Sequence, residues 1–594
     1  MTVNEKILNL RELMKDRGID YYIIPTNDPH GSEYLNQHYE SRRFLSGFSG
    51  SAGTLVVSLS EAALFVDGRY HIQADKETDG TEIKVYKVGT ANVPNYLQYI
   101  KERCNKSVIG FDGNVFSEKT YERLISDLPY CDFRIEEDLV DIIWKDRPKR
   151  SKEKAYFLND DIAGVKASDK INCIQNYLDK NNLDGIFISE LSDIMWIFNI
   201  RGNDIVHNPV AFSYCYITKE SSTVFLQDEA LSDELLMHLK TAETYVASYD
   251  EIKLELAKIK GKRVALDKEL TSSLNYKIIS VGNEIVSIKN YEVIKKHIKN
   301  ATEIAISKKY HMLDAVSMIK FIVYIKEAVK SNKITEYSAA MYLDSIRSKN
   351  EGFIDISFDT ICAYKENGAI VHYSPDKENS RILSDEGLLL VDSGAQYVGA
   401  TTDITRTISL GKLTDEEKKA YTLVLKGNLR LMDAVFIKGC RGENLDILAR
   451  EALWKAGLDY LHGTGHGIGA FLNVHEGPCS IRYKITENVQ PELEAGMILS
   501  DEPGLYVTGK YGIRHETQVL IEEKYNTEYG VFLGFSPLSL VPFEREAIIA
   551  ELLSNEELNV LNKYNELCYK ELKDLVTGKE KDWLIKETRQ ISCN

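Results

Sequence analysis

The sequence predicts a mixed fold, with two related N-terminal α/β domains followed by a C-terminal α+β domain. A helix-like segment that runs into a buried strand occurs twice, as EKILNLRELMKDRGIDYYIIP from residue 5 and as DKINCIQNYLDKNNLDGIFIS from residue 169. From about Ala301 the pattern changes to long helical stretches. The length of 594 residues is enough for about three to five domains of about 100–200 residues each.

The two copies continue in parallel, and this sets the expected domain boundaries. RRFLSGFSGSAGTLVVS and ALFVDGRY in the first copy correspond to MWIFNIRGNDIVHNPVAFSYCYIT and TVFLQDEALSDELL in the second. The polar stretch PKRSKEKAYFLNDD between them indicates a break. We therefore expect domains over residues 1–155, 156–300 and 301–594.

Helices and strands alternate in the third domain. It opens with apolar residues at helical spacing, namely Met312, Leu313, Val316, Ile319 and Ile322. Two further helices are expected, one at TDEEKKAYTLVLKGNLRLMDAV with Thr414 and Glu417 as a capping box, and one at ENLDILAREALWKAG that ends at Gly457. The residues after Pro542 also have a helical pattern, so we expect a C-terminal extension that packs on this domain.

Composition is that of an ordinary globular protein, with 43% hydrophobic and 27% charged residues. The N-terminus shows no apolar core of a signal peptide, and no run approaches the roughly 18 apolar residues of a membrane span. Nine cysteines, an odd number without a C-x-x-C pair, fit a reducing compartment. The net charge of -17 argues against general nucleic-acid binding. We expect a cytoplasmic protein with neither nucleic acid nor membrane as a partner.

Five candidate metal ligands lie in the last third of the chain, each in its own motif. They are Asp392 in LLLVDSGAQY, Asp403 in TTDITRT, His466 in HGTGHGIG, Glu502 in LSDEPG and Glu516 in GIRHETQ. Four carboxylates and one imidazole favour a pair of Mn²⁺-like ions over a thiolate-rich structural zinc site. A single Asp or Glu at a strand end is usually a solvated cap, so the interpretation depends on all five motifs together.

The spacing predicts how the two aspartates meet. Asp392 ends an apolar run and Asp403 begins a Thr-rich, strand-like run. We expect a β-hairpin with its turn centred between Tyr397 and Val398, which would place the two aspartates directly opposite each other with Cβ atoms about 5 Å apart. Two like charges at that distance need a cation.

The other three candidates lie in short extended or glycine-rich segments. In GIRHETQ the period of two puts Arg514, Glu516 and Gln518 on one face and His515 on the other. We expect His466 to lie in a loop whose glycines let the backbone approach a site closely. Glu502 precedes Pro503-Gly504, a turn signal that ends a strand.

The motifs then allow a resemblance to be stated. NGAIVHYSP, VDSGAQYVGATTDITRT, HGTGHGIGAFLNVHEGP, LSDEPGLYV and GIRHE, together with IIPTNDPHGSEYL, FVDGRYHIQA and FSPLSLVPF, resemble the aminopeptidase P or Xaa-Pro aminopeptidase family. The resemblance is to the long, three-domain cytosolic form, with creatinase-like N-terminal domains and a pita-bread metallopeptidase domain. It covers nearly the whole chain.

The resemblance implies two divalent metal ions, Mn²⁺ being favoured. Asp392 and Asp403 would hold one ion with Asp403 bridging, His466 and Glu502 would hold the other, and Glu516 would be the second bridge. A hydroxide between the ions would attack the scissile carbonyl, with Glu502 passing its proton to the leaving nitrogen.

Five further residues match positions around the substrate in that family, and Arg514 shares the face of Glu516. His372 and His475 would be catalytic hydrogen-bond donors to the peptide carbonyl or the oxyanion, while His462, Arg381 and Tyr506 would lie near the bound peptide. Arg514 would orient the ligand carboxylates, although a plain structural salt bridge is the alternative. Arg381 and Tyr506 could equally be surface or packing residues.

The implied activity is that of a metalloaminopeptidase, a homodimer that removes one residue from peptides with proline in second position. One alternative is another enzyme of the same fold, a prolidase restricted to X-Pro dipeptides or a relative of methionine aminopeptidase. A second is a pita-bread domain that has lost its metal and serves as a binding module. The presence of all five ligands argues against the second. One departure is His515, whose position more often holds an aliphatic residue in the family.

Overall fold

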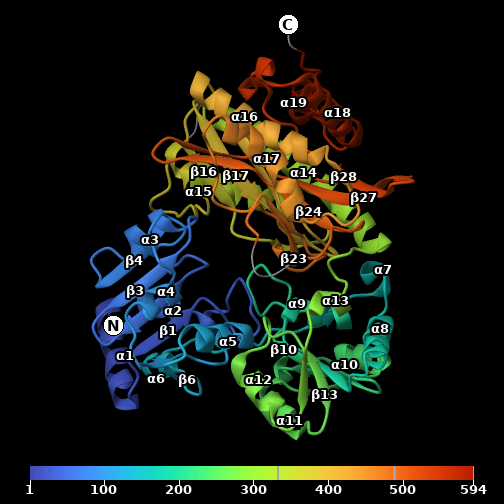
Figure 1. Ribbon diagram of the computed structural model, residues 1–594. Coiled ribbons are helices and arrows are strands. Elements are labelled where there is room, and N and C mark those ends of the chain that lie inside the picture. The colour runs from blue at the N-terminus through green and yellow to red at the C-terminus, as the bar shows by residue number, and fades with distance from the viewer. Residues whose placement is uncertain (331–332, 486–489, 593–594) are drawn as a thin grey trace. The chain divides into compact units, whose positions relative to one another are not determined.

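The computed structural model describes residues 1–330, 333–485 and 490–592, which form two compact units (Figure 1). The first unit comprises Met1–Asp160 and Val165–Lys295. The second comprises Asp161–Gly164 and Lys296–Asn594.

The first unit contains two six-stranded sheets with the same strand order. One runs β4-β3-β2-β1-β5-β6, with β1 Tyr21–Pro25, β2 Thr54–Ser58, β3 Ala62–Val66, β4 Ile83–Lys87, β5 Val108–Gly110 and β6 Asp132–Arg134. The other runs β12-β11-β10-β8-β13-β14, with β8 Gly185–Ile188, β10 Ser213–Thr218, β11 Ser222–Leu226, β12 Thr244–Ser248, β13 Arg263–Leu266 and β14 Glu284–Ser287. β1 and β8 each pair antiparallel with one neighbour and parallel with the other. The matching topology confirms the two related α/β domains.

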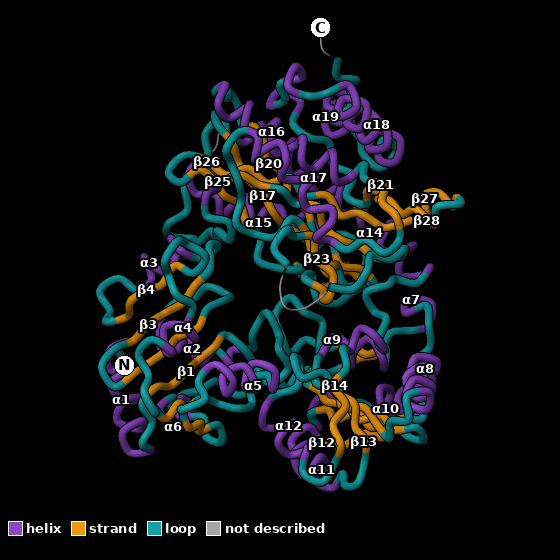
Figure 2. Tube along the Cα trace, viewed as in Figure 1, coloured by secondary structure: helices purple, strands orange, loops and turns teal. Residues whose placement is uncertain are grey.

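Helices cover both faces of these sheets, as the ribbon and tube views show (Figure 2). In the first domain they are α1 Val3–Arg17, α2 Ser41–Ser46, α3 His71–Glu77, α4 Tyr96–Lys101, α5 Glu118–Asp127 and α6 Leu139–Ile143. In the second they are α8 Ala167–Lys180, α9 Leu191–Phe198, α10 Asp233–Thr241, α11 Ile252–Lys258, α12 Ser273–Ser280 and α13 Asn290–Val293, with a small sheet of β7 Tyr156–Phe157 and β9 Ile200–Arg201. Alternate residues of β1 enter different cores: Tyr22 and Ile24 pack with α1, while Ile23 packs on the opposite face.

The second unit is built from antiparallel sheets. Its largest sheet has the order β21-β28-β27-β24-β22-β23, with β21 Val435–Ile437, β22 Gly465–Gly467, β23 Glu476–Ile481, β24 Ile498–Asp501, β27 Thr517–Thr527 and β28 Gly530–Pro537. Smaller sheets are β16-β17-β20 (Ile361–Tyr364, Leu388–Ser393, Ile404–Ser409), β15-β18-β19 (Phe353–Ile356, Ala395–Tyr397, Ala400–Thr401) and β25-β26 (Gly504–Val507, Tyr511–Arg514).

The second unit contains the helices that the sequence patterns predicted, together with the short α7. They are α7 Asp160–Ala163, α14 Ala301–Ala328, α15 Glu336–Arg347, α16 Asp415–Met432, α17 Gly442–Lys455, α18 Asn555–Leu572 and α19 Gly578–Glu587. Thr414 and Glu417 form the predicted capping box of α16, and Gly457 follows α17 with a φ of 73°. The C-terminal helices α18 and α19 contribute Leu561 and Leu584 to the main core of this unit, which confirms the helical extension.

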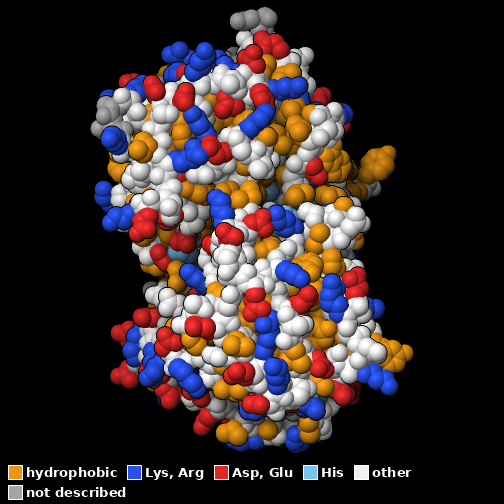
Figure 3. Space-filling view, turned by 90° about the vertical axis from the view of Figure 1, so that its left-hand side faces the viewer, with side chains coloured by type: hydrophobic (Ala, Val, Ile, Leu, Met, Phe, Trp, Pro, Cys, Tyr) orange, Lys and Arg blue, Asp and Glu red, His pale blue; other side chains and the backbone are white. Residues whose placement is uncertain are grey.

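Charged side chains of both signs are mixed over the described residues on the face shown in Figure 3. The described part of the chain contains eight of the nine cysteines, and all eight are free thiols. Within the same residues, no helix combines the length and the apolar character that crossing a membrane requires.

Candidate metal centre

The hairpin that carries the two aspartates exists, but its register differs from the prediction. Asp392 at the end of β17 pairs with Thr405 of β20, not with Asp403. The turn is centred between Val398 and Gly399, because Tyr397 pairs with Ala400 and Gly399 adopts a φ of 95°. A positive φ favours glycine, and that preference moves the turn by one residue from its predicted centre. The two aspartates are therefore diagonal neighbours on one face.

An interruption in both strands lies between Asp392 and Asp403. Regular pairing stops at Gly394, where a Cβ atom would lie 1.9 Å from the carbonyl oxygen of Thr402. The Ser357 hydroxyl donates a hydrogen bond of 2.8 Å to that same carbonyl, and the Ser357 amide donates to Gly394 at 3.2 Å. Only glycine fits this close crossing of the two strands.

His466 lies in the short strand β22 and not in a loop, which corrects the prediction. Its flanking glycines allow the tight packing that was expected: a Cβ on Gly465 would lie 2.0 Å from the Ser500 carbonyl oxygen, and one on Gly467 would lie 2.4 Å from that of Glu476. The His466 Nδ1 lies 3.0 Å from the Gly467 carbonyl oxygen. A carbonyl can only accept, so Nδ1 carries the proton and, in the neutral ring, Nε2 carries the lone pair that can bind a cation.

The two glutamates occupy the ends of neighbouring segments. Glu502 directly follows β24 and precedes β25, as the turn signal predicted. Glu516 lies in the short gap between β26 and β27, so the extended run predicted across it is interrupted. The Thr405 hydroxyl donates to Glu516 Oε2 at 2.8 Å, and the Ser500 hydroxyl donates to Glu502 Oε1 at 3.3 Å.

The five candidates converge. His466 Nε2 lies 3.6 Å from Asp403 Oδ2 and 3.5 Å from Glu502 Oε1. One ligand atom from each of Asp403, His466 and Glu516 can be chosen so that all three lie within 4.8 Å of one another, close enough to share an ion.

The electrostatics of the cluster are those of a site that needs positive charge. Burial, followed by repulsion from Glu516, raises the pKa of Asp403 and of Glu502 well above the usual range. Burial and the nearby Asp392 raise the pKa of Glu516 to about 7. One oxygen each of Asp392, Asp403 and Glu516 is buried without a hydrogen-bond partner among the described residues. Orphaned, mutually repelling carboxylate oxygens fit divalent cations.

A chain of hydrogen bonds leads from Asp392 to His462. Arg514, which is 2% exposed, donates from Nη2 to Asp392 Oδ2 at 2.6 Å and from Nη1 to the Tyr506 hydroxyl at 2.7 Å. That hydroxyl lies 2.8 Å from His462 Nε2. The His462 Nδ1 lies 2.7 Å from the Gly463 carbonyl oxygen, so in the neutral ring Nε2 accepts from Tyr506.

Two more predicted residues border this cluster, and one lies in a different environment. The His475 ring stands edge-on to His466, with centroids 4.3 Å apart. His372 follows Val371, whose carbonyl oxygen lies 3.5 Å from Arg514 Nη1. The Arg381 guanidinium pairs instead with Glu366, and its side chain is 45% exposed.

His515 faces away from the ligands, as its place in the sequence predicted. It is fully buried, with Tyr421 and Phe543 edge-on at 4.2 Å and 5.4 Å. Burial lowers the pKa of His515 to about 3, so the ring is neutral at physiological pH. It fills the core as an apolar group would.

Sequence reasoning missed Thr405 and Ser500. Thr405 receives a hydrogen bond from Arg514 Nε at 3.2 Å while it donates to Glu516, so it joins two predicted site residues. The Ser500 hydroxyl accepts from the His466 amide at 2.9 Å. The available signal was the period of two, which puts Thr405 on the face of Asp403 and Ser500 on the face of Glu502.

Known domain families match most of the chain. Residues 6–142 and residues 146–303 each match the Creatinase/Prolidase N-terminal domain. Residues 305–523 match metallopeptidase family M24, and residues 531–591 match the C-terminal region of that peptidase. The carboxylate cluster thus lies in a metallopeptidase domain of family M24.

Full-length relatives refine this assignment. The chain is 39% identical to a protein of Sordaria macrospora over 99% of this chain and 100% of the relative, and 38% identical to one of Botryotinia fuckeliana over 100% and 93%. Both relatives are named "Probable Xaa-Pro aminopeptidase P". The chain belongs to the Xaa-Pro aminopeptidase P family.

A solved structure agrees over the full length. It is the X-prolyl aminopeptidase of Caenorhabditis elegans, described as a cytosolic enzyme with a di-nuclear active site. It matches this chain with a TM-score of 0.94 and 32% identity, covering 100% of both chains.

Proposed function

We propose that this chain is a dinuclear-metal aminopeptidase that hydrolyses the first peptide bond of peptides with proline in second position. The observation that carries the proposal is the convergence of Asp392, Asp403, His466, Glu502 and Glu516 in one buried cluster with orphaned oxygens. These five residues would hold two divalent cations, which would lower the pKa of a water between them and polarise the substrate carbonyl. Mn²⁺ suits the oxygen-rich donor set best.

The side chains around the cluster have separate tasks in this proposal. Glu502, held by Ser500, takes the proton of the attacking water and gives it to the leaving nitrogen. His475 and His372 donate hydrogen bonds to the reacting carbonyl as negative charge develops on its oxygen. Arg514 orients Asp392 through its hydrogen bond.

Substrate recognition would involve the other end of the hydrogen-bond chain. His462 and Tyr506 are joined edge-to-face, with ring centroids 5.4 Å apart, and they offer an aromatic surface to a proline ring. Proline has a fixed φ and lacks an amide hydrogen, so a flat surface suits it better than a strand-like binding edge. Arg381 would contact the bound peptide if Glu366 released it.

The wider assignments are part of the same proposal. The chain would divide into domains at residues 1–155, 156–300 and 301–594, and two sheets of like topology support the first two. The family resemblance supports a homodimer. The cytosolic description of the nematode neighbour supports a cytoplasmic location.

The test is hydrolysis of Arg-Pro-Pro by metal-stripped protein before and after addition of Mn²⁺, with Glu502→Gln alongside. Free arginine should appear only with the metal and only with the unaltered chain. Arg-Pro serves as the second substrate, because a prolidase would prefer the dipeptide. Absence of arginine release with any divalent metal would refute the proposal.

A further inference from the structure

A fully buried ion pair lies under the hairpin that carries Asp392 and Asp403. Arg347 at the end of α15 donates from Nε to Asp314 Oδ1 at 2.7 Å and from Nη2 to Asp314 Oδ2 at 2.9 Å. Asp314 belongs to α14. Its side chain is 4% exposed, and that of Arg347 is 0% exposed. Two parallel hydrogen bonds fix both distance and orientation between the helices.

Both partners also contact the hairpin. Arg347 Nη2 approaches the carbonyl oxygen of Ser393, the residue after Asp392, at 3.4 Å. The Tyr397 hydroxyl, near the hairpin turn, donates to Asp314 Oδ1 at 3.0 Å. Asn350 donates to the same hydroxyl at 3.0 Å. The pair thus touches the hairpin at two points between the two aspartates.

Stability alone does not explain this arrangement. A buried ion pair gains little over well-packed apolar residues, because desolvation cancels most of the attraction. Arg347 Nη1 is also buried without a partner among the described residues, which adds to the cost. What the pair provides is fixed geometry. That geometry matters here because regular pairing between the aspartates is interrupted at Gly394.

We propose that Asp314, Arg347 and Tyr397 are positioning residues that set the spacing of Asp392 and Asp403, and so the affinity of the centre for divalent cations. The inference rests on the proposed function. α14 and α15 act as a fixed base, and the Asp314–Arg347 pair transmits their position to the hairpin. None of the three touches the substrate or the cation itself.

Calorimetric titration of metal-stripped protein with Mn²⁺ tests this inference. Tyr397→Phe keeps the ring and removes the two hydrogen bonds of its hydroxyl, to Asp314 and from Asn350. Arg347→Met removes the ion pair. Supporting residues typically alter metal affinity by about 10–100-fold. We expect Arg347→Met to weaken at least one Mn²⁺ site by about tenfold or more and Tyr397→Phe to weaken it by a smaller factor. Excess Mn²⁺ should restore most of the kcat on Arg-Pro-Pro.

Two controls separate positioning from general destabilisation. Tyr310→Phe removes only the hydroxyl of the ring that stacks on Tyr397 at 4.7 Å and leaves the Asp314 hydrogen bonds intact. Arg42→Met removes a buried arginine from the first domain, where its guanidinium holds the carbonyls of Phe48 and Gly50. Both should bind Mn²⁺ like the unaltered chain.

The outcomes are distinct. Unaltered protein that neither binds Mn²⁺ nor cleaves Arg-Pro-Pro would refute the proposed function. Unaltered protein that does both, beside an Arg347→Met variant with normal Mn²⁺ affinity, would overturn the positioning role alone. If Arg347→Met does not fold, the Mn²⁺ affinities of Tyr397→Phe and Tyr310→Phe are compared instead. Equal affinities of these two variants would overturn the inference.

Discussion

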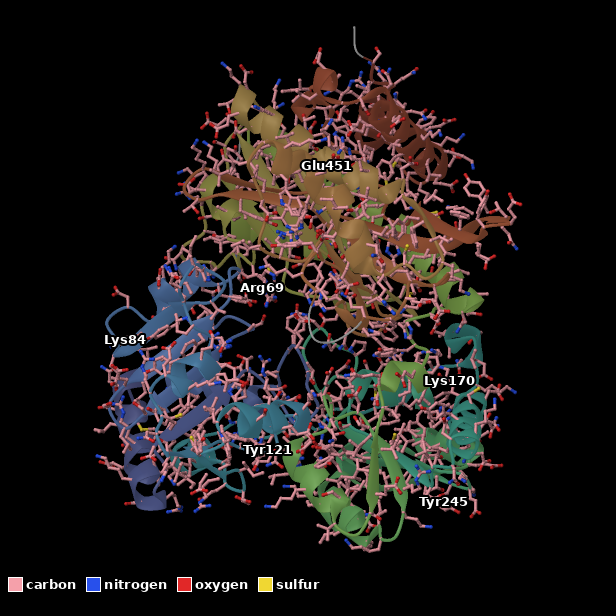
Figure 4. The ribbon with its side chains drawn as sticks, viewed as in Figure 1. Arg69, Lys84, Tyr121, Lys170, Tyr245 and Glu451 are labelled. Carbon is pink, nitrogen blue, oxygen red and sulfur yellow. The ribbon has the colours of Figure 1, made fainter. Side chains whose placement is uncertain are left out.

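The two units of the chain contain contrasting arrangements of charged side chains. In the first unit each duplicated domain places a lysine of its first helix over an aromatic ring: Lys6 lies over Phe44 at 4.2 Å, and Lys170, which Figure 4 labels, lies over Trp196 at 3.9 Å. Each lysine also donates to the backbone carbonyl of that aromatic residue, at 2.8 Å in both domains. Neutral carbonyl acceptors and the face of a ring stabilise each ammonium group.

The second unit leaves its central charge unbalanced. Four carboxylates face one another there, and Arg514 is the cation that touches Asp392. The pKa of three of these carboxyl groups is raised by burial and mutual repulsion. The lysine–aromatic contact occurs in both duplicated domains, so we assign it to packing. The carboxylate cluster has excess negative charge, which indicates a ligand that supplies positive charge.

The largest expected effect comes from removing one carboxylate. Glu516→Gln should lower kcat/KM on Arg-Pro-Pro by more than about 100-fold, the upper range for residues that only support a ligand. The metal-stripped variant should nevertheless be more stable than the unaltered chain by about 1–3 kcal/mol at pH 8, because a repelled charge is gone. Thermal unfolding with and without Mn²⁺ measures this, and Glu523→Gln, at an exposed position on the following strand β27, is the control. Loss of stability in the metal-free variant would contradict the comparison.

The same carboxyl group predicts a pH dependence. Its pKa is raised from 4.5 to about 7 in the folded chain, so between those values the folded state binds more protons than the unfolded state. The contribution of Glu516 is therefore most favourable below pH 4.5 and is lost as the pH rises through 7. Urea unfolding of metal-stripped protein gives the free energy of unfolding at each pH. The trend should appear when the values for Glu516→Gln are subtracted from those for the unaltered chain. Mn²⁺ affinity should rise over the same pH range, because the ligand must be deprotonated.

A smaller effect is expected along the hydrogen-bond chain. Tyr506→Phe disconnects Arg514 from His462 without disturbing the cation cluster directly. We expect activity on Arg-Pro-Pro to fall by about tenfold. Tyr511→Phe, on the neighbouring strand β26, is the matched control because the hydroxyl of Tyr511 bonds to Glu416 instead. Equal kinetics of the two variants would show that the chain of hydrogen bonds has no role in turnover.

The domain architecture and the ligand candidates could be predicted from the sequence, whereas the hairpin register and the residues that support the ligands depend on local geometry. The duplicated pattern predicted two related sheets because hydrophobic periodicity determines which face of a strand is buried. The ligand candidates followed from residue types and motif order. The turn centre of the hairpin was wrong by one residue, which shifts the partner of Asp392 from Asp403 to Thr405, because the preference of Gly399 for a positive φ outweighed the pattern of the strands. The roles of Thr405, Ser500 and the Asp314–Arg347 pair depend on tertiary contacts that no local pattern contains.

The smallest effect on activity is expected in the first unit. Lys170→Met should reduce the free energy of unfolding by about 1–3 kcal/mol, because two acceptors lose their donor in a buried site. Lys6→Met should cost less, since Lys6 is only half-buried. Both variants should keep the kcat/KM of the unaltered chain once folded. A fall in the Mn²⁺ affinity of either folded lysine variant would contradict the conclusion that these lysines serve packing and not the metal centre.

The central claim is that the five carboxylate and imidazole ligands form a two-cation centre. Anomalous diffraction at the manganese edge, from crystals grown with Mn²⁺, tests it most directly. The account predicts two peaks, one on the side of Asp392 and the other on the side of His466, with Asp403 and Glu516 between them. A single peak, or peaks bound elsewhere while these side chains stay unliganded, would contradict it.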